Sequence, residues 1–217
     1  MSEPSLEFRG VTKTFGGVRA LRDVSFVIPR GEIHALVGEN GAGKSTLIRI
    51  CGGSLVPDSG TVILDGQPLR ARSAHDSQAA GISIVHQEIP ICRDLTAAEN
   101  VFLGQDLPRR AGLIDWREVN DRAAQLFARL RAEIRPTDPA GDLTIAQQQI
   151  LVIAKALSHE SKLVIMDEPT SALSKQESSR LFDILRQLKD QGVTIVYVSH
   201  RLEEVFGIAD TGTMDTP

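Results

Sequence analysis

The stretch Gly38-Glu39-Asn40-Gly41-Ala42-Gly43-Lys44-Ser45 decides the fold of this 217-residue chain. Its spacing is G-x-x-x-x-G-K-S, in which glycines let the backbone turn tightly and direct successive N–H groups at an anion. The Lys44 ammonium suits the β- and γ-phosphates of a nucleotide, and the Ser45 hydroxyl suits Mg²⁺. The stretch therefore predicts a loop that binds the phosphates of a nucleotide.

The residues on either side supply the strand and the helix that such a loop needs. Ile33-His34-Ala35-Leu36-Val37 is typical of a buried strand, and Ser45-Thr46-Leu47-Ile48-Arg49-Ile50 indicates the start of a helix. A helix N-terminus adds partial positive charge toward the phosphates, so Thr46 joins the expected contacts. This context favours a nucleotide-binding loop over a glycine-rich turn that matches by chance.

A second strand ends in two carboxylates. Leu163-Val164-Ile165-Met166 is apolar without alternation, which favours a parallel strand covered on both faces. Asp167 and Glu168 follow at its carboxyl end, where ligands of open α/β sheets lie. We expect Asp167 to hold Mg²⁺ through water and Glu168 to polarise the attacking water as a general base. An acidic strand end that only caps a turn is the alternative, and the phosphate loop weighs against it.

Between these motifs, the spacing T-x-x-Q of Thr144 and Gln147 predicts a capping box and a helix start. Apolar residues at i, i+3, i+4 and i+7 then predict a buried stripe on that helix: Ile150, Ile153, Ala154 and Leu157. Because this helix precedes the acidic strand, the chain resembles the ABC ATPases. Their signature motif, commonly L-S-G-G-Q, binds the nucleotide held by a partner domain.

The resemblance covers roughly residues 6 to 209 and implies roles for further residues. Phe15 matches the aromatic residue that stacks on adenine. Gln87 matches the glutamine that links the Mg²⁺ site to the transporter-facing subdomain, and His200 matches the histidine that contacts the γ-phosphate. At the signature, Thr144 with Ala146 and Gln147 would contact the nucleotide of the partner domain.

The signature departs from the general pattern, because Ile145 and Ala146 stand where two glycines are usual. Glycines there permit a close approach to the γ-phosphate, which larger side chains crowd. However, the ending A-Q-Q-Q is similar to the first nucleotide-binding domain of the monosaccharide importers of the ribose, galactose, arabinose and xylose type. The segments 86–88, 95–104 and 199–206 resemble the same subfamily. We therefore interpret the altered signature as a trait of that subfamily.

The resemblance implies an α/β fold, a P-loop NTPase of the ABC ATPase type, in one domain over 1–217. The sheet core would be mixed, with N-terminal antiparallel strands, and a helical signature subdomain would be inserted over about 88–160. The sequence itself predicts strands over 6–15, 20–28, 33–37 and 61–64, and helix caps at Asp115 and Ser174. Residues 211–217 are polar and lack strand alternation, so we expect a disordered or truncated tail that leaves the strand over 194–199 with an open edge.

Composition agrees with a globular domain and excludes some classes. The chain is 41 % hydrophobic with a net charge of −4 and a pI near 5.8, which gives no basic face for nucleic acid. Cys51 and Cys92 lack metal spacing and are expected to be reduced packing residues. No apolar run approaches the roughly eighteen residues of a membrane span, and residues 1–4 do not resemble a signal peptide.

The function that the resemblance implies is an ATP-binding, Mg²⁺-dependent ATPase subunit that energises monosaccharide import. Its partners would be membrane-spanning permease subunits, a second nucleotide-binding domain and, indirectly, a periplasmic or extracellular sugar-binding protein. It would lie at the cytoplasmic face of the membrane. Two alternatives stay open: an ABC ATPase without a membrane partner, which predicts basic arms or a long coiled coil that this chain lacks, and a truncated module with little turnover. The membrane subunits and the binding protein would choose the sugar.

Overall fold

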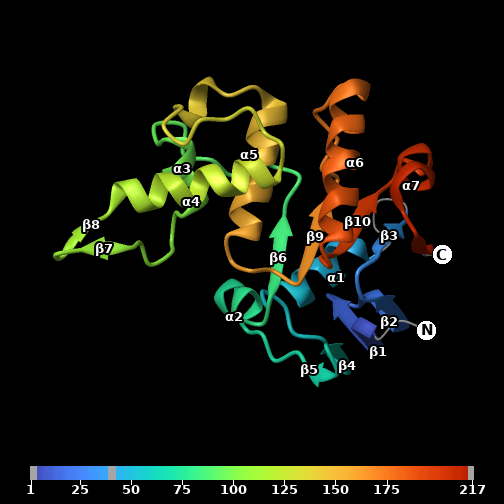
Figure 1. Cartoon of the computed structure of the whole chain (residues 1–217). Coiled ribbons are helices and arrows are strands. Elements are labelled where there is room, and N and C mark those ends of the chain that lie inside the picture. The colour runs from blue at the N-terminus through green and yellow to red at the C-terminus, as the bar shows by residue number, and fades with distance from the viewer. Residues whose placement is uncertain (1–3, 39–42, 215–217) are drawn as a thin grey trace. The chain divides into compact units, whose positions relative to one another are not determined.

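The computed structural model describes residues 4–38 and 43–214, and the chain divides into two compact units (Figure 1). Unit 1 comprises residues 1–84, 161–168 and 185–217, and unit 2 comprises 85–160 and 169–184. Unit 2 thus takes in a segment, 169–184, that lies beyond the range expected for the helical subdomain.

An antiparallel sheet in unit 1 contains the N-terminal strands that the sequence predicts. Its strand order is β2-β1-β4-β5. The strands span Pro4–Phe15 (β1), Val18–Pro29 (β2), Ser59–Leu64 (β4) and Gln67–Pro68 (β5). Gly16 and Gly17 both have positive φ (51° and 89°) and turn β1 into β2 as a tight hairpin. β1 begins two residues before the predicted strand and ends where predicted, whereas β2 extends beyond the predicted strand at both ends.

A second, five-stranded sheet has the order β11-β3-β10-β9-β6. Its strands span Ile33–Val37 (β3), Ile82–Val85 (β6), Leu163–Asp167 (β9), Thr194–Ser199 (β10) and Thr211–Met214 (β11). β10 pairs in parallel with both β3 and β9, and every residue of β10 is buried. Because the three strands run the same way, their carboxyl ends meet at one edge of the sheet.

The C-terminal segment corrects one prediction. Residues 211–214 are not frayed, because they form β11, which pairs in parallel with β3 from Thr211 opposite His34 to Met214 opposite Val37. The predicted open edge is also wrong, since β10 lies between β3 and β9. Residues 215–217 lie outside the described part of the chain.

His34 explains how a polar segment becomes a strand. Its Nδ1 lies 2.9 Å from Thr211 Oγ1 and its Nε2 lies 2.9 Å from Thr213 Oγ1. The Thr211 hydroxyl also donates to Glu32 Oε2 at 3.1 Å. His34 is buried and lies nearly parallel to the Phe26 ring, and this burial lowers the pKa of the imidazole to about 4. Side-chain hydrogen bonds to a buried partner therefore add to the backbone pairing of β11 with β3, in a segment that lacks apolar alternation.

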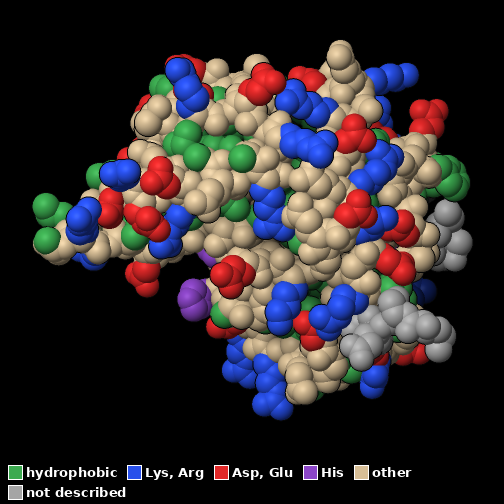
Figure 2. Space-filling view, viewed as in Figure 1, with side chains coloured by type: hydrophobic (Ala, Val, Ile, Leu, Met, Phe, Trp, Pro, Cys, Tyr) green, Lys and Arg blue, Asp and Glu red, His purple; other side chains and the backbone are tan. Residues whose placement is uncertain are grey.

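Helices complete unit 1 and form most of unit 2. They span Lys44–Cys51 (α1), Ala74–Ala79 (α2), Ala97–Val101 (α3), Trp116–Arg129 (α4), Ile145–Leu157 (α5), Lys175–Asp190 (α6) and Leu202–Ile208 (α7). A 3₁₀ turn covers Ala140–Asp142, and a hairpin joins β7 (Arg109–Arg110) to β8 (Leu113–Ile114). Figure 2 shows hydrophobic side chains at the outer end of this hairpin, where Leu113 is exposed.

The predicted helix caps are confirmed by their hydrogen bonds. Asp115 Oδ1 accepts from the Glu118 N–H at 3.2 Å at the start of α4. Thr144 and Gln147 form both bonds of a capping box, and Ser174 and Glu177 do the same before α6. Each cap satisfies N–H groups that the first turn of a helix leaves without backbone partners.

The core of unit 1 is built from the inward faces of the strands and of α1. It includes Leu6, Phe8, Ile48, Ile165 and Val198. The predicted apolar stripe of α5 is buried as expected. Cys51 is buried in α1, whereas Cys92 is exposed, so the packing role predicted for both thiols holds for Cys51 only. Among the described residues no helix is both long and apolar enough to cross a membrane.

We predict that His34 makes the stability of the fold depend on pH. Its pKa is about 4 in the folded protein and about 6.5 when exposed, so the unfolded chain binds the proton first as pH falls. The stability that the neutral ring supports is complete above pH 6.5 and is lost as pH falls toward 4. From pH 7 to pH 5, this group alone should lower the free energy of unfolding by about 2 kcal/mol.

Urea denaturation at both pH values measures this effect. His34→Gln keeps one donor and one acceptor but does not titrate, so its free energy of unfolding should fall less between pH 7 and pH 5. An equal fall in the variant and the unmutated protein would contradict the assignment to His34.

Candidate nucleotide-binding site

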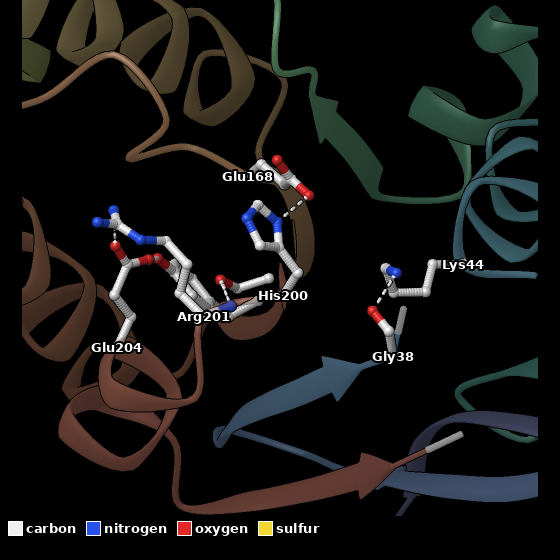
Figure 3. Close-up of polar contacts among 8 residues, drawn as sticks. Gly38, Lys44, Glu168, His200, Arg201 and Glu204 are labelled. Carbon is white, nitrogen blue, oxygen red and sulfur yellow. Dashed lines mark hydrogen bonds and ion pairs between the residues drawn. The ribbon is translucent and has the colours of Figure 1, made fainter. Parts of the chain in front are cut away.

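Lys44 lies where the predicted phosphate loop closes. β3 ends at Val37, and Lys44 is the first residue of α1, the helix that leaves the loop. Its Nζ donates to the Gly38 carbonyl at 2.5 Å, and the residue is buried (Figure 3). The loop residues Glu39, Asn40, Gly41 and Ala42 lie outside the described part of the chain, so their expected phosphate contacts stay predictions. The ammonium is therefore held at the carboxyl end of β3.

Gly43 is the N-cap residue of α1, and only glycine suits its position. Its φ is 85°, in the left-handed region that L side chains rarely adopt. A Cβ there would lie 2.7 Å from both the Ala20 carbonyl oxygen and Leu21 Cδ2. Beyond this cap, Ser45 is exposed and Thr46 is partly buried in the first turn. The α1 N-terminus, with the Ser45 hydroxyl in its first turn, is the helix end that can attract a phosphate.

Asp167 and Glu168 lie at the carboxyl end of β9, as predicted. Asp167 is the last residue of the strand and is partly buried. Glu168 has a φ of 47°, which is uncommon for a residue other than glycine, and its N–H donates to the Val198 carbonyl at 3.0 Å. This bond to the neighbouring strand β10 supports the left-handed turn with which the chain leaves the sheet.

Glu168 and His200 form a pair across the ends of β9 and β10. Glu168 Oε1 lies 2.7 Å from His200 Nδ1, and the two side chains are 18 % and 54 % exposed, respectively (Figure 3). A carboxylate that binds an imidazole nitrogen is oriented by it and can accept a proton from a water molecule. The structure therefore brings together two of the three predicted catalytic residues by a direct hydrogen bond.

The oxygen donors of unit 1 fit Mg²⁺ bound together with phosphates. The Ser45 hydroxyl and the Asp167 carboxylate are hard oxygen ligands, which Mg²⁺ prefers. Among the described residues no group of three or more His, Cys, Asp or Glu side chains could hold a metal. A Mg²⁺ site needs only one or two protein ligands when water and phosphate oxygens supply the other coordination positions. Ser45 and Asp167 would be the ligands from unit 1.

Phe15 presents a partly exposed aromatic ring at the end of β1. The residue is 43 % exposed, and the Lys13 ammonium lies 5.8 Å from the ring centroid. Lys13 in turn pairs with Asp58, with 2.6 Å between Nζ and Oδ1. An exposed ring of this kind can stack on a planar base.

The remaining predicted residues belong to unit 2. Gln87 is exposed just after β6. Gln147 is engaged in the capping box and also donates from Nε2 to the Glu133 carbonyl at 3.1 Å. Ile145 is half exposed and Ala146 is partly buried in the first turn of α5. The structure thus places Thr144, Ala146 and Gln147 together at one helix start.

The motifs did not indicate Tyr197, Arg201 and Glu204, of which Tyr197 and Arg201 both donate to the Glu204 carboxylate. Arg201 and Glu204 lie beside His200 (Figure 3). The spacing of Arg201 and Glu204 at i and i+3 is a signal for an ion pair on a helix start. The buried tyrosine gave no such signal, because an aromatic residue inside an apolar strand is ordinarily a packing residue.

A phosphate loop between β3 and α1, with carboxylates at the end of a parallel strand, defines the class of P-loop nucleotide-binding proteins. Within that class, residues 21–171 match the family model described as ABC transporter. The chain belongs to the ABC transporter family.

Known proteins agree with this family and with the predicted subfamily. The chain is 50 % identical over 207 residues to a ribose import ATP-binding protein, RbsA 1, of Streptomyces coelicolor. That match covers 95 % of the chain and 41 % of the relative, so the chain spans less than half of that protein's length. The predicted resemblance to the monosaccharide importers is confirmed.

Solved structures show the same fold. The ADP conformation of an ATP-binding cassette of an ABC transporter superposes with a TM-score of 0.87 at 25 % identity, covering 99 % of this chain and 88 % of that one. A dimeric, post-hydrolysis ATP-binding cassette bound to ADP and Pi gives a TM-score of 0.79 at 25 % identity, covering 97 % and 94 %.

We predict that Gly43→Ala destabilises the chain more than a matched glycine substitution. Gly192 has nearly the same φ, 88° against 85°, but a Cβ on Gly192 would meet no atom within 4 Å. Both variants therefore carry the backbone strain, and only Gly43→Ala adds steric overlap. The free energy of unfolding should fall by at least about 1 kcal/mol more in Gly43→Ala. Urea denaturation of the two variants measures the difference, and equal values would contradict the close approach to Ala20.

Proposed function

We propose that this chain binds ATP with Mg²⁺ and hydrolyses the ATP to energise import of a monosaccharide through an ABC transporter. The observation that carries the proposal is the hydrogen bond between Glu168 and His200, at the same sheet edge as Lys44. The proposal is supported by the similarity to the ribose import ATP-binding protein over 95 % of the chain.

Each residue of the site has a role that follows from its place. Lys44 would bind the β- and γ-phosphates, with Ser45 and Thr46 at the N-terminus of α1. Ser45 and Asp167 would hold Mg²⁺, which would neutralise charge on the phosphates, and the family resemblance adds Gln87 as a further ligand. Phe15 would stack on the adenine.

The hydrolytic step would depend on Glu168 and His200. Glu168 would orient the attacking water and accept its proton at a carboxylate oxygen. His200, bonded to Glu168 through Nδ1, would hold that carboxylate in place and present the rest of its exposed ring to the γ-phosphate. Glu168 would thus be the general base, and His200 would be the group that orients it.

The chain would act in an assembly rather than alone. We infer that Thr144, Ala146 and Gln147 at the start of α5 contact a nucleotide held by a second nucleotide-binding domain. The similarity to a dimeric cassette bound to ADP and Pi supports an assembly of two such domains. Membrane-spanning permease subunits would complete the importer at the cytoplasmic face of the membrane, with a sugar-binding protein on the other side.

We predict opposite kinetic defects for the two principal site residues. Glu168→Gln removes the base but keeps the shape, so kcat for ATP hydrolysis should fall roughly 10²-fold or more with ATP affinity retained. Lys44→Ala should weaken ATP binding itself. Steady-state ATPase assays and titration with a fluorescent ATP analogue separate the two effects.

Glu118→Gln, on the exposed face of α4, is the matched control and should leave both quantities unchanged. Glu168→Gln with an unmutated hydrolysis rate would overturn the assignment of the base, and Lys44→Ala with unmutated ATP affinity would overturn the phosphate site.

A further prediction concerns assembly. Because the resemblance implies that the start of α5 contacts a nucleotide on another domain, the chain by itself should be mostly monomeric and a weak ATPase. Sedimentation velocity with and without ATP, together with ATPase rates at rising protein concentration, tests this expectation. A tight dimer that forms without ATP and hydrolyses at the full rate would contradict it.

A further inference from the structure

Tyr197, Arg201 and Glu204 form a hydrogen-bonded network at the turn from β10 into α7, and Figure 3 shows the bond between Arg201 and Glu204. The Tyr197 hydroxyl donates to Glu204 Oε2 at 2.9 Å, and Arg201 Nη1 donates to Glu204 Oε1 at 2.5 Å. Tyr197 is fully buried and the Glu204 side chain is only 12 % exposed. Both carboxylate oxygens are thus engaged, one from the sheet and one from the turn.

The network lies on both sides of His200 along the chain. Tyr197 lies in β10, three residues before His200, and Arg201 and Glu204 follow His200 at the start of α7. The Arg201 N–H also donates to Ser199 Oγ at 3.0 Å, which fixes the turn itself. The backbone that carries His200 is therefore held from both sides.

His200 needs this support because its own side chain has little packing. The ring is 54 % exposed, and its Nδ1 lies 2.7 Å from Glu168 Oε1. A half-exposed side chain gains little from neighbours, so its direction depends on the backbone from which it projects.

α7 cannot supply that position by itself. The helix spans only Leu202–Ile208, which is too short to be stable in isolation. Val205 packs with Ala35 and Val37 of β3, so the middle of α7 is anchored on the sheet. The first turn of α7 is anchored instead by Glu204, whose bond to Tyr197 reaches into the buried strand.

The two hydrogen bonds to Glu204 differ in how much they contribute to stability. Arg201 is about half exposed, and exposed ion pairs contribute little to stability. Tyr197 is buried and its hydroxyl donates to a charged acceptor, which makes a stronger bond. Of the two bonds to Glu204, the one from Tyr197 is therefore the stronger, and it links β10 to the start of α7.

We propose that Tyr197 and Glu204 are positioning residues that aim His200 at Glu168, and that the hydrolytic step depends on them. The inference rests on the proposed ATPase function. Neither residue need touch nucleotide, since both would act through the turn that carries His200.

A first experiment observes the His200–Glu168 contact without any enzymatic activity. In the full chain labelled with ¹⁵N-histidine, the ring signals of His200 are assigned by their loss in His200→Ala, and Glu168→Ala gives the signals expected when the contact is absent. Tyr197→Phe should move the His200 signals at least halfway toward that reference. Glu204→Gln keeps an acceptor for Tyr197 but loses the charge, so it should move them less.

Ser77→Ala is the matched control, because it also removes a buried hydroxyl that donates a hydrogen bond, here to the Cys51 carbonyl at 2.8 Å. It should leave the His200 signals unchanged. Unchanged His200 signals in Tyr197→Phe would overturn the proposal, whatever the ATPase activity of the chain.

A second experiment is a double-mutant cycle in the assembled, ATP-hydrolysing protein. Tyr197→Phe should lower kcat about threefold to tenfold, less than the full energy of a hydrogen bond to a charged group because Tyr197 acts through His200, with KM for ATP unchanged. In the His200→Ala background the same change should have no further effect on kcat, because its action passes through His200. Thermal stability should fall equally in both backgrounds.

The same kcat ratio in both backgrounds would show a purely structural role for Tyr197 and overturn the proposal. If instead Glu168→Gln were inactive and His200→Ala fully active, the ATPase function would stand, and the dependence of hydrolysis on this network would be refuted.

Discussion

The parallel pairing of β10 with β3 and β9 is the constraint on which the rest of the structure depends. β3 leads to Lys44, β9 to Asp167 and Glu168, and β10 to His200. Residues far apart in sequence meet at one sheet edge because their strands share one direction, and no loop has to reach across the sheet. Every residue of β10 is buried, as is typical of a central parallel strand covered on both faces, and four of its six residues are β-branched.

The chain leaves this edge through backbone conformations that ordinary residues avoid. Gly43 and Glu168 both have left-handed φ, at the start of α1 and after β9. At Gly43 the conformation comes with a close approach to Ala20, which excludes any Cβ. At Glu168 it is held by a bond to the neighbouring strand. Backbone strain of this kind persists only where the surrounding structure holds the residue in its conformation. Here the two strained residues lie beside Lys44 and at the proposed base Glu168 itself.

The sequence predicted those parts of the fold that have a local physical cause. Caps at Asp115, Thr144 and Ser174 are short-range hydrogen-bonding patterns, and each is present. The strand β11 was missed because its stabilising partner, His34, is distant in the sequence. The phosphate loop and the acidic strand end could be placed from their motifs, and the resemblance supplied His200. The bond from Tyr197 to Glu204 could not be predicted, because it depends on how α7 docks on the sheet.

The contacts of His34 also fix where its single proton lies. The Thr211 hydroxyl donates to Glu32, so its oxygen is left to accept from His34, and Nδ1 must carry the hydrogen. Nε2 is then the acceptor for the Thr213 hydroxyl. The three bonds therefore run in one direction, from Thr213 through the ring to Thr211 and on to the Glu32 carboxylate. A chain of aligned dipoles that ends on a negative charge strengthens each of its members, so one imidazole tautomer is selected and the last strand is tied to β3 by a polarised relay.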